Sequence, residues 1–325
     1  MSGCIVIGTG CSLPERAMFN RELEEIVDTS DEWIATRTGI KSRYIAGKGE
    51  ETSQLAAEAS RQALASAGVA AEEIDLIILA TISAEIAMPS CACLVQKEIG
   101  AVNAFAFDIN AACCGFAYGL DLADKYIRAT PNLKILVIGA ETLSSRTNWL
   151  DRNTCVLFGD GAGACVVTGG PEGRGLLGSR LFSDGRLWSL LYMEGPPSMN
   201  SELERPGKEG PYIQMAGRDV FKYAVRAMGD AITRVLADLK LNSDDLKFII
   251  PHQANIRIIQ SLRERLGVSA EKVYVNIDKY GNTSAASVPI AIDEINRAGR
   301  LLPGDLVLFC TFGAGLTWGA TVLRW

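Results

Sequence analysis

The sequence predicts an α/β fold in which most of the β-sheet is buried. Short runs rich in β-branched and large apolar residues alternate with amphipathic segments of helical length, the pattern of strands and helices that share a core. Most of these runs are almost continuously apolar, so we expect both faces of the strands to be covered. The predicted strands comprise residues 5–7, 74–79, 104–108, 135–138, 164–167, 248–250, 273–277 and 306–309.

One helix has clear predicted ends. Thr52 is a predicted N-cap, because its hydroxyl oxygen can accept a hydrogen bond from a free backbone N–H of the first turn. Gly68 follows the last predicted helical residue, Ala67, and glycine readily adopts the left-handed conformation that closes a helix. We therefore expect a helix over residues 52–67.

Two pairs of segments resemble each other across the chain. EEIDLII (72–78) resembles DDLKFII (244–250), and GAGACVV (161–167) resembles WGATVL (318–323). Generic βα units share such acidic and apolar patterns, so these residues alone leave duplication and coincidence equally open. A duplication would divide the chain into residues 1–172 and 173–325, within a glycine-rich stretch. The Pro-, Gly- and charge-rich segment 194–211 predicts an inserted loop.

Composition and charge exclude several classes of function. The chain has 325 residues, 48% of them hydrophobic, which is enough for a large core and about two domains. Its net charge of −6 disfavours nucleic-acid and anionic-membrane partners, which select cationic surfaces, so an acidic partner would need a local basic patch. We expect a cytoplasmic protein, because no signal peptide or membrane-spanning run is evident.

The chain contains nine cysteines but a single histidine. Most cysteines lie in apolar runs, where a small buried thiol is the usual role, and a chain without a signal peptide favours reduced thiols. Cys91 and Cys93 lack a second pair of ligands, so we expect no metal site.

Cys113 and Cys114 lie where the strand at 104–108 gives way to a helical pattern. A thiol at a helix N-terminus faces unpaired N–H groups and the positive end of the helix dipole, which lowers its pKa and favours the nucleophilic thiolate. The same junction supplies backbone donors for an oxyanion. Spacing alone does not distinguish the two cysteines, and packing in the core is the alternative role for both.

Three further strand ends carry polar or flexible residues. His252 follows the strand at 248–250, Asn282 precedes a predicted helix at 283–298, and residues 312–319 are glycine-rich after a strand. Taken singly, these features are typical of a structural histidine, an N-cap and a tight turn. Because α/β proteins place ligands at strand ends, the four junctions together predict one convergent site.

These motifs, assembled in order, resemble the β-ketoacyl-acyl carrier protein synthase III family. They are NAACCGF (110–116), PHQAN (251–255), GNTSAAS (281–287) and FGAGLTWG (312–319), together with TSDEWIATRTGI (29–40). The resemblance covers nearly the whole chain. It implies a thiolase-like fold, with two similar α/β halves layered α-β-α-β-α, and a homodimer that starts fatty acid synthesis from acyl-coenzyme A and malonyl-acyl carrier protein.

The resemblance also assigns the chemistry. Cys113, rather than Cys114, matches the family's nucleophile, and His252 and Asn282 match the groups that hydrogen-bond the malonyl thioester carbonyl during decarboxylation. Backbone N–H groups of Cys113 and Ala314 match the oxyanion hole; Ala314 replaces a glycine found in many members, so its donor survives only if its φ is negative. No metal or redox cofactor is implied.

Binding roles follow from the same resemblance. The matching coenzyme A contacts are Trp33 and Arg152 around the adenine, with Thr29, Arg37 and Asn255 nearby. Lys222 and Arg257 match the carrier-protein docking surface. Met88 replaces an aromatic residue that reaches into the partner subunit's acyl pocket in acetyl-selective members; methionine is flexible, so a longer or branched starter is expected. Helix packing for Trp33 and solvated surface charge for the basic residues are the alternatives.

Four other functions are compatible with parts of this pattern. A papain-like protease shares the order Cys, His, Asn but not the C-G-[SA]-C-[WY] motif. A degradative thiolase needs a second active-site cysteine, whereas Cys310 lies within a strand. A non-enzymatic scaffold would not retain all three site residues. A specialised relative that makes polyketides, quinolones or esters would keep them, and it stays open.

Overall fold

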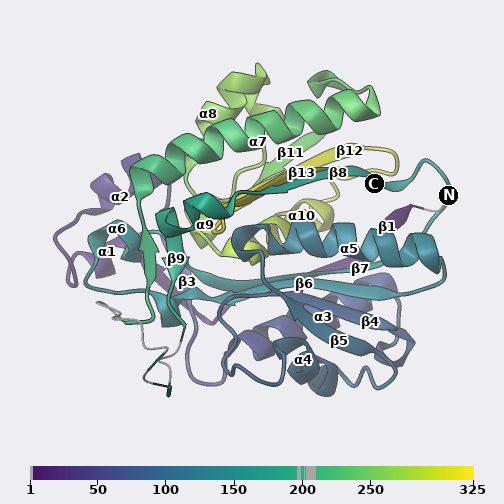
Figure 1. The fold of residues 1–325 in the computed structure, drawn as a ribbon, viewed down its shortest axis with the longest axis horizontal. Coiled ribbons are helices and arrows are strands. Elements are labelled where there is room, and N and C mark those ends of the chain that lie inside the picture. The colour runs from purple at the N-terminus through teal and green to yellow at the C-terminus, as the bar shows by residue number, and fades with distance from the viewer. Residues whose placement is uncertain (1–2, 196–198, 201, 203–209) are drawn as a thin grey trace.

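A computed structural model describes residues 3–195, 199–200, 202 and 210–325 of the chain. Its elements stack in five layers, alternately helical and β, with two sheets separated by a pair of helices (Figure 1). The first described residues and the C-terminus lie at the same side of the molecule (Figure 1). Among the described residues, no helix is both long and apolar enough to cross a membrane.

The first sheet is built from the first half of the chain. Its strands run in the order β1-β7-β6-β4-β5, with β4 parallel to both β5 and β6 and with β7 antiparallel to β1 and β6. The central strands β4 and β6 are buried along their whole length, as their continuous apolar runs predict. The bounds are β1 Cys4–Ser12, β4 Leu76–Ala80, β5 Phe105–Ile109, β6 Ile135–Thr142 and β7 Asp160–Gly169.

The second sheet is built from the second half. Its order is β11-β12-β13-β8, with β11 parallel to β12 and the other pairs antiparallel. The bounds are β8 Gly175–Ser183, β11 Phe248–Pro251, β12 Leu306–Gly313 and β13 Thr317–Arg324. The chain passes from the first sheet to the second between β7 and β8, at residues 170–174.

Helices cover both sheets. On the outer faces, α3 and α4 pack against the first sheet, and α7 and α8 against the second; α5 and α10 lie between the sheets (Figure 1). Each interface buries apolar side chains, the main source of stability in such layers. The bounds are α3 Thr52–Ala67, α4 Cys91–Ile99, α5 Gly115–Ala129, α7 Gly217–Leu239, α8 Ile256–Leu266 and α10 Ser287–Arg297.

Smaller elements surround the layers. The hairpin-like pairs β2/β3 and β9/β10 are antiparallel. Most of the predicted loop 194–211 lies outside the described residues. The bounds are α1 Asn20–Leu23, α2 Asp31–Thr38, α6 Arg152–Cys155, α9 Ile277–Tyr280, β2 Arg16–Phe19, β3 Ser42–Ile45, β9 Leu191–Met193 and β10 Ile213–Met215.

The two sheets repeat one arrangement. The order β1-β7-β6-β4 in the first sheet matches β8-β13-β12-β11 in the second, with the same parallel and antiparallel pairs. The segments that resemble each other in sequence occupy matching strands: 72–78 leads into β4 and 244–250 into β11, while 161–167 lies in β7 and 318–323 in β13. The similarity therefore marks equivalent positions in two halves.

Three local predictions were wrong in detail. The predicted strand 273–277 forms only a single parallel bridge from Val273 to Ile249, and the chain then turns into α9. Glu51 is the N-cap of α3 and Thr52 is its first helical residue, whose hydroxyl donates to the Ser83 carbonyl at 2.8 Å. The helix predicted at 283–298 begins with a 3-10 turn, η8 (Ser284–Ala286), before α10. Gly68 does close α3, with φ +64°.

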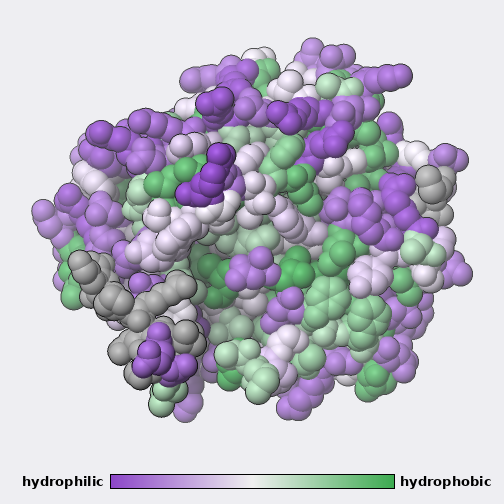
Figure 2. Space-filling view, viewed as in Figure 1, coloured by the Kyte–Doolittle hydropathy of each residue, from purple (hydrophilic) through white to green (hydrophobic). Residues whose placement is uncertain are grey.

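The edge strand β5 carries exposed aromatic residues. Phe105 is 50% exposed and packs edge-on against Tyr126 of α5, with a centroid separation of 6.0 Å. Figure 2 shows hydrophobic residues gathered on this face, over α5 and the β4–β5 side of the first sheet. An exposed strand edge with apolar side chains is a surface suited to pairing with another chain.

Candidate active site

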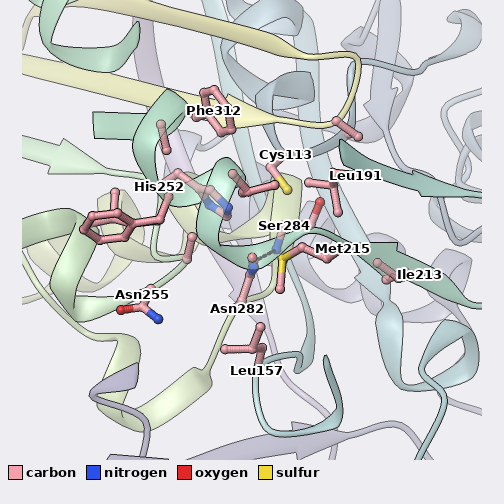
Figure 3. A pocket seen from close by; sticks show the side chains of 18 of the residues that line it. Cys113, Leu157, Leu191, Ile213, Met215, His252, Asn255, Asn282, Ser284 and Phe312 are labelled. Carbon is pink, nitrogen blue, oxygen red and sulfur yellow. Dashed lines mark hydrogen bonds between the residues drawn. The ribbon is translucent and has the colours of Figure 1, made fainter. Parts of the chain in front are cut away.

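The side chains of Cys113, His252 and Asn282 line one cavity of about 1230 Å³. Figure 3 shows the thiol, the imidazole and the carboxamide pointing toward the same space, although Cys113 comes from the first half of the chain and the other two come from the second. The convergent site predicted from the sequence is therefore present in the structure.

Cys113 lies in a 3-10 turn, η2 (Ala112–Cys114), that continues into α5. Ala112 enters this turn with a positive φ of 45°. Gly313, at the end of β12, packs directly against the turn: a Cβ at this glycine would lie 2.8 Å from the Cys113 backbone nitrogen. A side chain at position 313 would thus displace the thiol-bearing turn.

The two adjacent cysteines have different environments. Cys113 is partly exposed to the cavity, whereas Cys114 is fully buried and its Sγ lies 3.3 Å from the Thr317 carbonyl oxygen, which accepts its S–H. This difference agrees with the sequence-based choice of Cys113. Cys310 is also buried, within β12, and does not line the cavity.

The predicted lowering of the Cys113 pKa was wrong. Burial raises the pKa of Cys113 to about 12, and the nearby Ser284 hydroxyl opposes that effect only in part. Desolvation of a thiolate in this enclosed turn outweighs the favourable helix terminus. Activation of the thiol therefore requires a group that accepts its proton.

His252 follows β11 and is 2% exposed. Its backbone N–H donates to the Cys310 carbonyl at 2.8 Å, and its Nδ1 lies 2.7 Å from the Ser287 hydroxyl. The Gln253 backbone N–H donates to that same hydroxyl oxygen at 3.4 Å, which leaves the Ser287 proton free for Nδ1. This arrangement favours the tautomer with a proton on Nε2, a donor into the cavity.

Burial lowers the pKa of His252 to about 4. The imidazole is therefore neutral at pH 7 and acts as a hydrogen-bond donor without charge. A group with so low a pKa is a weak proton acceptor for a thiol.

Asn282 both caps a turn and faces the cavity. Its Oδ1 accepts a hydrogen bond from the Ser284 backbone N–H at 2.9 Å, while its own backbone N–H donates to the Leu157 carbonyl at 2.9 Å. Because Oδ1 is engaged, the amide orientation is set and the Nδ2 group is left to donate. The capping role and the predicted site role thus belong to the same side chain.

Ala314 lines the cavity beside the Cys113 turn and does not adopt a positive φ. The condition for keeping a backbone donor at this position is met. Its carbonyl accepts the Thr317 hydroxyl at 2.9 Å, and that hydroxyl also lies 3.1 Å from the Ala111 carbonyl. Thr317 thereby ties the glycine-rich turn to the start of the cysteine turn.

Of the predicted coenzyme A residues, Trp33 and Arg37 lie on α2 and Arg152 on α6, whereas Thr29 and Asn255 precede α2 and α8. The guanidinium carbons of Arg37 and Arg152 lie 4.8 and 4.9 Å from the centroid of the Trp33 ring. Trp33, Arg37 and Asn255 line the cavity; Arg152 and Thr29 do not. The Thr29 hydroxyl is buried without a hydrogen-bond partner in the described structure, and Asn255 caps α8 through the Arg257 backbone N–H at 2.9 Å.

The cavity is lined by basic but not acidic side chains among the described residues. Arg37, Arg218, Lys222 and Arg257 all contribute to its wall, and no aspartate or glutamate does. All four side chains belong to exposed residues. This is the local basic patch that an acidic partner of a chain with net charge −6 would require.

Met88 lies outside the cavity of its own chain. It is 86% exposed, in the segment between β4 and α4. A side chain in this position contacts bulk solvent in the single chain, so it cannot shape the acyl pocket of the same subunit.

Sequence reasoning missed several groups that support the site. Ser287 orients His252, Ser284 contacts Cys113, and Glu141, a fully buried carboxyl at the end of β6, accepts the Ser284 hydroxyl at 3.0 Å. The signal available was a glutamate within an otherwise apolar run, since a buried acid requires dedicated donors. In the described residues, no cluster of three or more His, Cys, Asp or Glu side chains is arranged to hold a metal.

Comparisons with known proteins agree with this geometry. Residues 107–185 match the family model of 3-oxoacyl-[acyl-carrier-protein] synthase III, and residues 236–325 match its C-terminal model. The chain is 54% identical to β-ketoacyl-[acyl-carrier-protein] synthase III of Desulfotalea psychrophila, over 99% of each chain.

Solved structures give the same result. The structure of 3-oxoacyl-[acyl-carrier-protein] synthase III from Aquifex aeolicus is 48% identical, with a TM-score of 0.93 over 99% of this chain and 100% of that one. The priming β-ketosynthase of the R1128 polyketide pathway is 36% identical, with a TM-score of 0.93 over 99% and 96% of the two chains. The chain therefore belongs to the β-ketoacyl-acyl carrier protein synthase III family and has its thiolase fold.

Proposed function

We propose that this protein joins the acyl group of an acyl-coenzyme A to malonyl-acyl carrier protein, with loss of carbon dioxide, and so starts fatty acid synthesis. The observation that carries the proposal is the convergence of Cys113, His252 and Asn282 in one basic-walled cavity. The product is a 3-ketoacyl-acyl carrier protein. Family membership and the names of the relatives support the same reaction.

In the first half-reaction, Cys113 attacks the thioester of acyl-coenzyme A. The tetrahedral oxyanion is held by the backbone N–H groups of Cys113 and Ala314, and coenzyme A leaves as its thiolate. The close contact of Gly313 with the Cys113 turn supports this assignment, because it brings the 313–315 backbone to the reacting carbon.

In the second half-reaction, malonyl-acyl carrier protein occupies the vacated cavity. His252 and Asn282 donate hydrogen bonds to its thioester carbonyl, where negative charge develops as carbon dioxide departs. The resulting carbanion attacks the acyl-Cys113 carbonyl and releases the Cys113 thiolate. No step requires a metal or redox cofactor.

The coenzyme A nucleotide is assigned to Trp33, Arg37, Arg152, Thr29 and Asn255. A base stacked between Trp33 and Arg152 would need about 7 Å between their planes, two stacking distances. The present separation of 4.9 Å is smaller, so Arg152 must swing aside on binding. It is held by the Asp28 carbonyl, which accepts its Nη1 at 2.8 Å on the protein surface.

The carrier protein is assigned to the basic rim around Lys222 and Arg257. Arg257→Glu should raise the KM for malonyl-acyl carrier protein by about tenfold, the effect of one reversed charge at a docking surface, and leave Cys113 acylation unchanged. Arg174→Glu is the matched control, because Arg174 is exposed in the turn between β7 and β8 and does not line the cavity. An unchanged KM in the Arg257 variant would remove this docking assignment.

We also propose a homodimer in which Met88 enters the partner's acyl pocket. The exposure of Met88 and the apolar edge at β5 support it. Sedimentation of the purified protein should give a dimer mass, and Met88→Phe should narrow the range of accepted starters. A monomer with unchanged starter range in the variant would contradict this assembly.

A specialised condensation is the second candidate. The similarity to the priming β-ketosynthase favours it, because the same three groups would serve a polyketide starter step. The two candidate functions are separated by which acyl-coenzyme A thioester the protein prefers as its starter. A panel of acyl-coenzyme A thioesters of different length and branching, with malonyl-acyl carrier protein as the extender, should yield 3-ketoacyl-acyl carrier protein.

The roles of the three side chains are tested by half-reactions. His252→Ala should still acquire an acyl group from acyl-coenzyme A but lose about 10²–10³-fold in decarboxylation of malonyl-acyl carrier protein. Intact-mass measurement follows the first step, and release of labelled carbon dioxide follows the second. Decarboxylation at the wild-type rate in this variant would reject the proposed role, and absence of product with every starter would reject the function.

A further inference from the structure

Glu141 is a fully buried carboxyl that connects the two halves of the chain beside the active site. Its Oε2 accepts hydrogen bonds from the Ser83 hydroxyl at 2.5 Å, the Ile82 backbone N–H at 3.1 Å and the Thr81 hydroxyl at 3.2 Å. Its Oε1 accepts the Ser284 hydroxyl at 3.0 Å. The three donors to Oε2 follow β4, whereas Ser284 comes from η8 in the other half.

Ser284 lies between this carboxyl and the reactive thiol. The turn η8, which begins with Ser284, packs against the turn η2, which holds Cys113. Both side chains line the cavity and are drawn next to each other in Figure 3. The Ser284 hydroxyl lies close enough to the Cys113 thiol to affect the pKa of that thiol. The three groups therefore form a chain: thiol, hydroxyl, carboxylate.

We infer that Glu141, acting through the Ser284 hydroxyl, accepts the proton of Cys113 when the thiol becomes a nucleophile. The inference rests on the acyl transfer to Cys113 proposed above. Glu141 does not touch the acyl group, so it is a positioning and proton-holding residue rather than one that contacts substrate.

The proton transfer balances over a full catalytic cycle. As the sulfur of Cys113 bonds to the acyl carbon, its proton passes to the Ser284 oxygen and the Ser284 proton passes to Glu141 Oε1. Coenzyme A departs as a thiolate and takes a proton from solvent. When the carbanion later releases Cys113 as a thiolate, the proton returns from Glu141 through Ser284, and the site is reset.

The environment of Glu141 suits this role. Burial raises the pKa of Glu141 to about 7, close to the pH at which a general base is most effective. His252, which lines the cavity, has its pKa lowered to about 4 and its Nδ1 occupied by Ser287. The titratable groups that sense the Glu141 charge are the thiols of Cys113 and of Cys91, at the start of α4.

The experiment measures alkylation of Cys113 by iodoacetamide between pH 5 and 9, with the modified residue identified by fragment-ion mass spectrometry. This probe reports thiol activation without any acyl-coenzyme A. The variants are Glu141→Gln, Ser284→Ala and, as the matched control, Ser83→Ala. Ser83 donates to the same carboxyl but does not lie between it and Cys113.

The wild-type rate should rise with pH through an inflection near 7, because Glu141 must be ionised to accept the proton. Glu141→Gln and Ser284→Ala should lose that inflection and react about 10²-fold more slowly at pH 8, the contribution typical of a positioned base. Ser83→Ala should keep the inflection and shift it to higher pH, because the Ser83 hydrogen bond lowers the pKa of Glu141.

Several results would overturn the inference. An inflection near 7 that persists in Glu141→Gln would exclude this carboxyl, and a wild-type inflection near 4 would point to His252 instead. Equal effects of Ser83→Ala and Ser284→Ala would indicate a purely structural network. Glutamine can donate to Ser284 and accept the remaining donors, so the variant should fold; circular dichroism checks this.

The acyl-coenzyme A panel is independent of this measurement. A protein that transfers no acyl group but shows the pH-dependent alkylation would contradict the proposed function and support proton transfer from Cys113 to Glu141. If the wild-type protein condenses the substrates normally and the Glu141→Gln variant is alkylated at the wild-type rate, only the proposed proton transfer to Glu141 is contradicted.

Discussion

The junctions at residues 110–115 and 282–287, each of which leads into a helix between the sheets, share several backbone features but differ in their side chains. In each, an asparagine Oδ1 accepts the N–H two residues later: Ala112 to Asn110 at 3.3 Å, and Ser284 to Asn282 at 2.9 Å. The residue that donates then has a positive φ, 45° in the first junction and 50° in the second. A 3-10 turn and a central helix follow in both.

The difference between the junctions shows how a duplicated fold divides its chemistry. The first turn carries a thiol at its second position, where the second turn has Ala285. Both turns follow an asparagine, Asn110 or Asn282, but only the second has a hydroxyl within it, at Ser284, and a serine, Ser287, at the start of its helix. One half therefore supplies the nucleophile, and the other supplies side-chain donors and a proton path, because both turns line one cavity.

The strand ends facing these turns differ in a matching way. Glu141 on β6 and Gly313 on β12 occupy equivalent positions when the paired strands of the two sheets are aligned. The glutamate extends a carboxyl to Ser284, whereas the glycine leaves room for the Cys113 backbone. Each half thus shapes the turn contributed by the other.

The largest expected effect separates the two adjacent cysteines of the first junction. Cys113→Ala should reduce condensation by more than about 10³-fold, because no nucleophile remains. Cys114→Ala should retain acylation and lose only core packing. Intact-mass spectrometry after incubation with acyl-coenzyme A tests both variants, and full acylation of the Cys113 variant would reject the assignment.

The next effect compares the two asparagines. Asn282→Ala should lower the rate of decarboxylation by about 10²–10³-fold, since a donor to the developing enolate is removed. Asn110→Ala removes only the turn hydrogen bond and should lower the free energy of unfolding by about 1 kcal/mol. Similar rate losses in both variants would mean that the junctions share the chemistry equally.

A stability measurement tests the difference between the two strand ends. The pKa of Glu141 is raised from 4.5 to about 7, so the folded state holds its proton more tightly than the unfolded state. The stability associated with that proton is present below pH 4.5 and is lost as pH rises through 7. Glu141→Gln should therefore be more stable than wild type at pH 8 by on the order of 2 kcal/mol, and not at pH 4.5.

Urea unfolding at the two pH values provides the measurement. A Glu141→Gln variant that is less stable than wild type at pH 8 would show that the hydrogen bonds of the carboxylate outweigh its burial. If the Glu141→Gln variant is more stable than wild type at pH 8 and its Cys113 is alkylated more slowly, Glu141 contributes to the chemistry and lowers the stability of the protein.

The smallest effect concerns the positive φ shared by the turns. Ala112→Gly should raise the free energy of unfolding by less than about 1 kcal/mol, because glycine adopts this conformation without the clash of a Cβ. Ala111, with φ −133°, is the control, and its change to glycine should destabilise the protein. Loss of stability in both variants would show that packing of the methyl group dominates at Ala112.

Much of the fold and the identities of the site residues followed from the sequence. Continuous apolar runs marked the central strands β4, β6, β11 and β12, because strands buried on both faces need apolar residues at every position. The motifs around Cys113, His252 and Asn282 indicated the family, because they resemble its motifs in residue type and order. The repeated segments were also visible, though only the strand order established that they are equivalent.

The tertiary structure alone decided how the site residues interact. The pKa of Cys113 depends on burial by residues far away in the chain, and so does the neutral state of His252. The pairing of Glu141 with Ser284, 143 residues apart, follows from the stacking of two sheets and has no local signal. Local sequence motifs indicate which groups can react. Burial and contacts between side chains of the two halves of the chain determine which proton moves and which group accepts it.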